Sequence, residues 1–125
     1  MIRGIGIDTV TISEMAGISE GVGAGAMARM FTAEELTSSG NTSNPAEYLA
    51  TRFAAKEAVF KAVAPLLTGQ YFDLRVVETL NRIDGSPYIN IDDRLRDVLD
   101  RSGVHNLHIS ITTEGDLATA FVIAE

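Results

Sequence analysis

Two carboxylates and a lysine have the types and spacing that could do chemistry: Asp8, Glu57 and Lys61. Glu57 and Lys61 are four residues apart, so they share one face of a helix. Asp8 stands in an apolar, strand-like run, where a carboxylate is costly unless it is paired or bound to a metal. Two carboxylates, together with phosphate oxygens and water, make a typical magnesium site. The residues therefore allow a magnesium site, although neither carboxylate is decisive alone.

The same helix admits a simpler interpretation. Arg52 and Lys56, also four apart, form a stripe beside Glu57 and Lys61. A solvated pair of Glu57 and Lys61 would contribute only roughly a few tenths of a kcal/mol, and such pairs are common. Small residues adjoin this surface and allow a ligand or another backbone to come close: Ala50, Ala54 and Ala58. The helix alone therefore leaves a solvated face and a ligand-binding face both open.

The amino-acid composition restricts the class of protein to which this chain can belong. The chain has 125 residues, the size of one ordinary domain, and we expect a single domain over 1–125. It is 46% apolar and 22% charged, which is typical of a folded globular protein. It has no cysteine, so disulfides, zinc–thiolate sites, iron–sulfur clusters and a thiol nucleophile are excluded. The lack of cysteine also fits a reducing compartment.

Charge and hydropathy limit the partners. The net charge of −7 argues against nucleic acid as the main partner. A multiply anionic ligand would have to be bound by local positive charge, and a divalent metal would ease the repulsion. No apolar stretch approaches the roughly 18–20 residues that span a bilayer, so no membrane partner is expected. The N-terminus lacks the charged and apolar regions of a signal peptide, and we expect a cytoplasmic protein.

The first half of the chain should position Asp8 on a strand and Glu57 on a long helix. Thr32 and Glu35 make a capping box, Pro45 suits a first helical position, and Pro65 should end the helix that follows. The expected elements are a strand at 2–12, a short helix, a glycine-rich break and a second helical turn at 13–31, a helix at 32–40 and a long helix at 45–63.

The second half alternates between strand and helix patterns. We expect a strand at 73–80, a turn at 84–87, a strand at 88–91, a helix at 92–102 and a hairpin at 107–123. Strands and helices are mixed without regular βαβ repetition. The predicted fold class is therefore α+β.

Several motifs, in one order along the chain, carry a family resemblance. They are Gly6-Ile7-Asp8, Phe31-Thr32-x-x-Glu35, the run from Arg52 to Ala62, Gly85-x-Pro87, and His108-Ile109-Ser110-Ile111-Thr112. The central run matches the pattern [RW]-[FW]-x-x-K-E-A-x-x-K-A without a gap. The chain resembles the holo-acyl-carrier-protein synthases, which are magnesium-dependent enzymes that move 4'-phosphopantetheine from coenzyme A onto a carrier-protein serine.

The resemblance implies a role for each of the three site residues. Asp8 and Glu57 would hold magnesium together with the pyrophosphate of coenzyme A. Lys61 would contact the phosphates and assist the departing phosphate. Glu57, or a metal-bound water, would take the proton from the carrier serine, which attacks the β-phosphorus and releases adenosine 3',5'-bisphosphate. Phosphoryl-type transfer mainly needs in-line positioning and neutralised charge, and a metal with a lysine supplies both.

The resemblance also implies the rest of the binding site and the assembly. Arg52 and Lys56 are candidates for other phosphates of coenzyme A. The remaining candidates are the adenine-side turn Gly85, Ser86 and Pro87, and the hairpin residues Ser110, Thr112 and Thr113. The family fold has one long central helix on an antiparallel sheet. It usually forms a homotrimer with each site shared between two subunits, and it serves fatty acid or polyketide biosynthesis.

Three departures from the family pattern affect the expected partners. Thr113 stands where a histidine usually follows Ser-x-Thr, so a cation or donor near a nucleotide phosphate is lost. Glu14 stands where an arginine is expected, and Arg29 is the one basic residue between Asp8 and the loop at 38–44. The segment 64–71 lacks the usual Gly-Thr-Gly. An acidic docking surface should bind a strongly acidic free carrier poorly, so we expect a less acidic carrier domain, for instance inside a multidomain synthase.

One alternative from another class stays open. A non-catalytic module could hold coenzyme A or a carrier domain without transferring anything, and the changes at Glu14 and Thr113 keep this possibility. The presence of Asp8, Glu57 and Lys61 together argues against it, because binding alone does not need a metal at a scissile phosphate. The glycine run at 21–26 does not follow the first strand directly and lacks a Gly-Lys-[Ser/Thr], so it predicts a turn rather than a phosphate loop.

Overall fold

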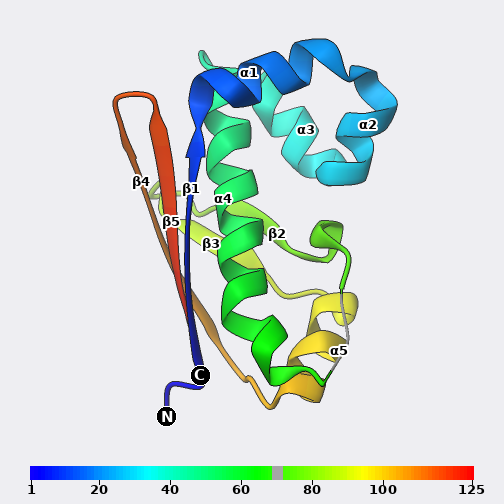
Figure 1. Ribbon diagram of the computed structural model, residues 1–125, viewed down its shortest axis with the longest axis vertical. Coiled ribbons are helices and arrows are strands. Elements are labelled where there is room, and N and C mark those ends of the chain that lie inside the picture. The colour runs from blue at the N-terminus through cyan, green and yellow to red at the C-terminus, as the bar shows by residue number, and fades with distance from the viewer. Residues whose placement is uncertain (69–71) are drawn as a thin grey trace.

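The chain forms an antiparallel sheet packed along one long helix (Figure 1). The computed structural model describes residues 1–68 and 72–125. In chain order the elements are β1 (Gly4–Thr11), α1 (Ile12–Gly21), α2 (Gly23–Met30), α3 (Ala33–Gly40), α4 (Pro45–Val63), the 3-10 turns η1 (Ala64–Leu66) and η2 (Leu74–Val76), β2 (Glu78–Asn81), β3 (Pro87–Asn90), α5 (Asp93–Ser102), β4 (Leu107–Glu114) and β5 (Leu117–Ala124). The predicted α+β class, with a long central helix on an antiparallel sheet, is confirmed.

The main sheet has the order β1–β5–β4, with every neighbouring pair antiparallel. α4 runs along one face of it, while α1, α2 and α3 gather at one end of the molecule (Figure 1). The positions of Gly4 and Gly6 face α4, since a Cβ on either would meet the backbone of that helix. Side chains alternate along a strand, so Asp8 points to the same face. The register of β1 therefore directs Asp8 toward α4.

Backbone contact between β1 and α4 is unusually close. A Cβ at Gly6 would lie 1.9 Å from the carbonyl oxygen of Ala58, and one at Gly4 would lie 2.0 Å from that of Ala62. Neither distance is compatible with a side chain, so glycine is required at both positions.

The alanine stripe of α4 is covered within one chain. Ala50, Ala54 and Ala58 are fully buried, and they belong to clusters that include Ala118 and Ala120 of β5. The backbone that comes close to this stripe is therefore that of the sheet in the same chain. The stripe offers no surface to a ligand or to a second subunit, because the sheet already fills the space.

Helix starts follow the sequence signals. Thr32 accepts a hydrogen bond from the N–H of Glu35, and Glu35 accepts one from the N–H of Thr32, which confirms the capping box of α3. Asn44 accepts from the N–H of Glu47, and Pro45 occupies the first turn of α4. None of the described helices is long and apolar enough to cross a bilayer.

The predicted strand at 73–80 is shorter than expected. Asp73 accepts a hydrogen bond from the N–H of Arg75 at 2.8 Å, and this starts the 3-10 turn η2. Regular pairing begins only at Glu78 and runs antiparallel to β3. Local side-chain capping therefore competes successfully with strand geometry here. Residues 69–71, part of the segment in which a Gly-Thr-Gly is missing, lie outside the described residues.

The close contact between β1 and α4 predicts that alanine substitutions at two glycines change the free energy of unfolding in opposite directions. Gly6→Ala should lower the free energy of unfolding by about 3 kcal/mol or more, because the methyl group has no space and must push α4 off the sheet. Gly17→Ala is the matched control: no atom lies within 4 Å of its Cβ position. That change should raise the free energy of unfolding by about 0.5–1 kcal/mol, because alanine favours the helix. Urea denaturation followed by circular dichroism measures both, and a Gly6→Ala protein of unchanged stability would contradict the analysis.

Candidate active site

Asp8, Glu57 and Lys61 come together where β1 crosses α4. Lys61 Nζ donates a hydrogen bond to Asp8 Oδ1 at 2.9 Å and another to the carbonyl oxygen of Ile7 at 3.0 Å. Glu57 lies one helical turn before Lys61 on α4, facing the same strand. The three candidate catalytic residues are therefore close in space, although Asp8 lies about fifty residues before the other two in the chain.

The two carboxylates repel one another. Burial raises the pKa of Glu57, the negative charge of Asp8 raises it further, and Lys61 partly opposes both effects. A divalent cation between the carboxylates would relieve this repulsion, and oxygen donors are the ligands that magnesium prefers. No group of three or more His, Cys, Asp or Glu side chains in the described part of the chain could hold a metal by itself. A magnesium ion here would take its remaining ligands from a bound molecule and from water.

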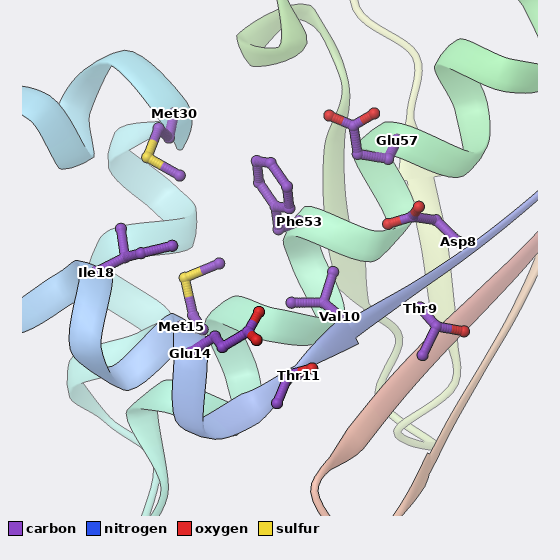
Figure 2. A pocket seen from close by; sticks show the side chains of 10 residues that line it. All are labelled: Asp8, Thr9, Val10, Thr11, Glu14, Met15, Ile18, Met30, Phe53 and Glu57. Atoms are coloured by element: carbon purple, nitrogen blue, oxygen red, sulfur yellow. The ribbon is translucent and has the colours of Figure 1, made fainter.

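A cavity of about 330 Å³ extends from the two carboxylates to the first two helices. Figure 2 shows the carboxylates of Asp8 and Glu57 at one side, while side chains from α1 and α2 project from the other. The apolar part of the wall is formed by Val10, Met15, Ile18, Met30 and Phe53. The charged residues that line it are all acidic: Asp8, Glu14 and Glu57. The surface beside the site is therefore apolar and negatively charged.

A second, smaller cavity collects most of the residues predicted to bind coenzyme A. Its volume is about 210 Å³, and it lies between α4, the β2–β3 hairpin and β4. Its lining residues are Arg52, Asn81, Gly85, Pro87, Ile111, Thr112 and Thr113. Five of these were named from the sequence: Arg52, Gly85, Pro87, Thr112 and Thr113.

Arg52 is the charged residue among those that line this cavity. The residue is only 4% exposed, and its guanidinium lies 4.1 Å from the ring centroid of Tyr48. It donates to Thr51 Oγ1 at 3.1 Å and to Asn81 Oδ1, while its Nε has no hydrogen-bond partner among the described residues. No salt bridge to Arg52 occurs in the described ranges 1–68 and 72–125. A buried cation with a spare donor on the wall of a cavity fits an anionic ligand.

The role expected for Lys56 is wrong. We expected it to bind a phosphate, but its side chain is fully buried and forms an ion pair with Glu35 at 2.7 Å. Its ammonium group also donates to the carbonyl oxygens of Leu74, at 3.2 Å, and Val77. All three donors are used inside the protein, so Lys56 is a structural residue in this fold.

Two further candidates stand apart from the cavities. The Ser86 hydroxyl donates to Asp84 Oδ1 at 2.6 Å and so stabilises its own turn. Ser110 is exposed on β4, where it pairs across the sheet with Phe121. Neither lines the two cavities described above.

Sequence reasoning missed several residues that line the two cavities, and it missed Tyr48, which contacts Arg52. Tyr48 lies four residues before Arg52, and this spacing on α4 could have indicated their contact. Asn81 had no such signal, because it reaches Arg52 through the placement of a separate hairpin. Met15 and Met30 carried no sequence signal for the site, and the structure places both on the wall of the cavity that faces the two carboxylates (Figure 2).

Comparisons with known proteins identify the family of the chain. Residues 4–122 match the family model described as the 4'-phosphopantetheinyl transferase superfamily. The holo-[acyl-carrier-protein] synthase of Halothermothrix orenii is 34% identical over 125 residues, covering 100% of this chain and 98% of the relative. That of Desulforudis audaxviator is 36% identical over 124 residues, covering 99% of this chain and 93% of the relative.

Solved structures show the same fold. The crystal structure of the holo-[acyl-carrier-protein] synthase from Neisseria meningitidis has 34% identity and a TM-score of 0.88, covering 100% of this chain and 99% of that one. The enzyme from Bacillus anthracis in complex with CoA (3',5'-ADP) has 28% identity and a TM-score of 0.77, covering 99% and 96%. The resemblance to the holo-acyl-carrier-protein synthases is confirmed, and the chain belongs to the 4'-phosphopantetheinyl transferase superfamily.

Proposed function

We propose that this chain transfers the 4'-phosphopantetheine group of coenzyme A to a serine of an acyl carrier protein or carrier domain, and releases adenosine 3',5'-bisphosphate. The observation that carries the proposal is the meeting of Asp8 of β1 with Glu57 and Lys61 of α4, the helix that also presents Arg52 to a second cavity. The names of the relatives support the same reaction. Fatty acid or polyketide biosynthesis in the cytoplasm would be its setting, and the absence of cysteine fits a reducing compartment.

The site residues have separate tasks in this reaction. Asp8 and Glu57 would hold magnesium, which when bound neutralises the charge of the pyrophosphate and supports in-line displacement. Glu57 would take the proton of the carrier serine through its carboxylate. The serine oxygen then bonds to the β-phosphorus as the bond from that phosphorus to the leaving phosphate breaks. Lys61 stabilises the negative charge on the leaving group.

The second cavity would hold the nucleotide end of coenzyme A. Arg52 supplies a buried positive charge for a phosphate, and the hydroxyl groups of Thr112 and Thr113 line the same cavity. Thr113 keeps a hydrogen-bond donor where the family usually has histidine, although it adds no positive charge. Gly85 and Pro87 form the opposite wall, beside which an adenine ring could lie.

The carboxylates allow a direct test. Asp8→Asn and Glu57→Gln should each lower transfer at least about a hundredfold, since each removes one of two negative charges that hold the metal. The measurement is the mass increase of a carrier protein incubated with coenzyme A and magnesium, with circular dichroism as the check on folding. Chelation of divalent metal should abolish transfer by the unmutated protein, and added magnesium should restore it.

Glu34→Gln is the matched control, because Glu34 is an exposed acid in the first turn of α3 and should leave transfer unchanged. Full activity in a folded Asp8→Asn or Glu57→Gln protein would remove that residue from the site. If the unmutated protein binds coenzyme A but modifies no carrier, it is a binding module instead of a transferase.

We further propose a homotrimer with sites shared between subunits. The sheet face that points away from α4 is apolar and uncovered: Ile5 is 62% exposed, Ile7 57% and Phe121 40%. Ile7 pairs directly with Phe121 across β1 and β5, so the exposed groups form one patch. Apolar patches of this kind mark association surfaces, and closed symmetry is usual for homo-oligomers.

Sedimentation equilibrium at micromolar concentration should show about three chains for the unmutated protein. Ile7→Glu should produce a folded monomer with reduced transfer, because a charge in the patch opposes its burial. Val22→Glu changes an exposed apolar residue between α1 and α2 and should leave the trimer intact. A stable, fully active monomer of the unmutated chain would refute the shared site.

The acceptor we propose is a carrier of low negative charge, such as a domain within a multidomain synthase. α1 carries Glu14 and Glu20 and has no basic residue. Glu14 also lines the cavity that opens beside the two carboxylates (Figure 2). Like charges across a docking surface slow association and oppose binding.

Reversing the charge of Glu14 tests this acceptor. Glu14→Arg should lower the KM for a strongly acidic free-standing carrier by about tenfold and change kcat less, because the residue affects docking and not the transition state. Activity of the unmutated protein on that carrier should stay level or rise with salt, since screening relieves repulsion. Glu34→Arg on α3 serves as control and should change the KM little. Tight binding of an acidic carrier that collapses as salt rises would disprove this part of the proposal.

A further inference from the structure

A buried ion pair lies outside the reaction just described. Glu35 of α3 and Lys56 of α4 are 2.7 Å apart, and both side chains are fully buried. Removing two charges from water is costly, and their attraction compensates only when their remaining hydrogen bonds are also made. The partners that complete those hydrogen bonds therefore indicate what the pair does.

The partners belong to the backbone around β2. Lys56 Nζ donates to the carbonyl oxygens of Leu74 and Val77, and Glu35 Oε2 accepts from the N–H of Thr79 at 3.2 Å. Among the described residues β2 pairs only with β3, in a sheet of two strands, so these groups face an edge at which no described strand lies. A two-stranded hairpin is marginally stable alone. The ion pair takes the place of a third strand along this edge.

A second connection joins the same helix start to the hairpin. The hydroxyl of Thr32, the N-cap of α3, donates to Glu78 Oε2 on β2. The other carboxylate oxygen, Glu78 Oε1, accepts from Asn90 Nδ2 on β3 at 2.9 Å. Both strands of the hairpin are thus attached to the capping box of α3.

This hairpin forms one wall of the cavity around Arg52. Asn81, the last residue of β2, accepts a hydrogen bond from Arg52 and donates one to the carbonyl oxygen of Gly85 at 2.8 Å. Gly85 and Pro87 line the cavity opposite the end of β4. The width of the cavity therefore depends on where the hairpin is held.

We propose that Glu35 and Lys56 are positioning residues for coenzyme A: by holding β2, they fix the hairpin wall of the cavity relative to Arg52. The inference rests on the proposed function, because it takes coenzyme A as the ligand of that cavity. Asp8, Glu57 and Lys61 lie where β1 crosses α4 and make none of the contacts to the hairpin described above. Loss of the pair should thus weaken coenzyme A binding more than it slows the chemical step.

The test is Lys56→Met, which keeps the side-chain length and removes the three donors. Its KM for coenzyme A should rise about tenfold or more while kcat at saturating coenzyme A changes less, which is the kinetic pattern of lost binding. The dissociation constant for coenzyme A, measured by calorimetry, should rise in parallel. Lys56→Arg retains several donors and should restore much of the affinity. A KM equal to that of the parent in folded Lys56→Met would overturn the proposal.

A matched control separates positioning from stability. Leu99 of α5 is fully buried, and Leu99→Ala should cost about 2–5 kcal/mol of stability without touching the hairpin contacts above. Its KM for coenzyme A should equal that of the parent at a temperature where both are folded. An equal rise in KM for Leu99→Ala would show that any loss of stability has this effect, and the positioning role would fall.

A second variant covers the case in which Lys56→Met does not fold. Glu35→Gln combined with Lys56→Met leaves no unpaired buried charge, so it should fold more readily and still raise the KM and the dissociation constant. Parent affinity in the folded double variant would also overturn the proposal. If the unmutated protein modifies no carrier, the proposed reaction fails instead, and calorimetry with coenzyme A still tests the positioning.

Discussion

The backbone contact between β1 and α4 is the constraint on which the rest of the structure depends. Gly4 and Gly6 bring the strand so near to the helix that no side chain fits between them and the carbonyl oxygens of Ala62 and Ala58. Two consequences follow from this contact. Ile5 and Ile7 of β1 are left on the outer face of the sheet, and Asp8 is held within hydrogen-bonding distance of Lys61. One contact thus determines both the proposed metal site and the surface proposed for assembly.

The cations of α4 each lie in a specific local environment. The chain is strongly acidic overall, with a net charge of −7, so it attracts an anionic ligand only through particular residues. Arg52 is buried with one donor unpaired among the described residues, Lys61 is exposed and paired with Asp8, and Lys56 is buried and fully bonded. Three cations of one helix therefore have three different environments, although they lie only four and five residues apart in the sequence.

Much of the fold followed from local signals, and the site followed in part. The caps at Thr32 and Asn44 marked α3 and α4, and the alternation in the last hairpin marked β4 and β5. Lys56 was assigned wrongly because its burial depends on Glu35, which is twenty-one residues away in the chain and has no helical spacing to it. The strand at β2 was predicted to begin too early for a related reason, since side chains from two other helices satisfy part of the backbone there.

α4 continues without a break past both cavities, so it fixes the distance between the residues that it contributes to them. Arg52 lines one cavity and Glu57 the other, and five residues of straight α-helix separate them by about 7.5 Å along the axis. No hinge or break interrupts the helix between Pro45 and Val63. A ligand that engages both residues must present its charged groups at a matching interval, whatever its chemistry in between. The fixed spacing along α4 would thus select ligands by the distance between their charged groups, without a conformational change.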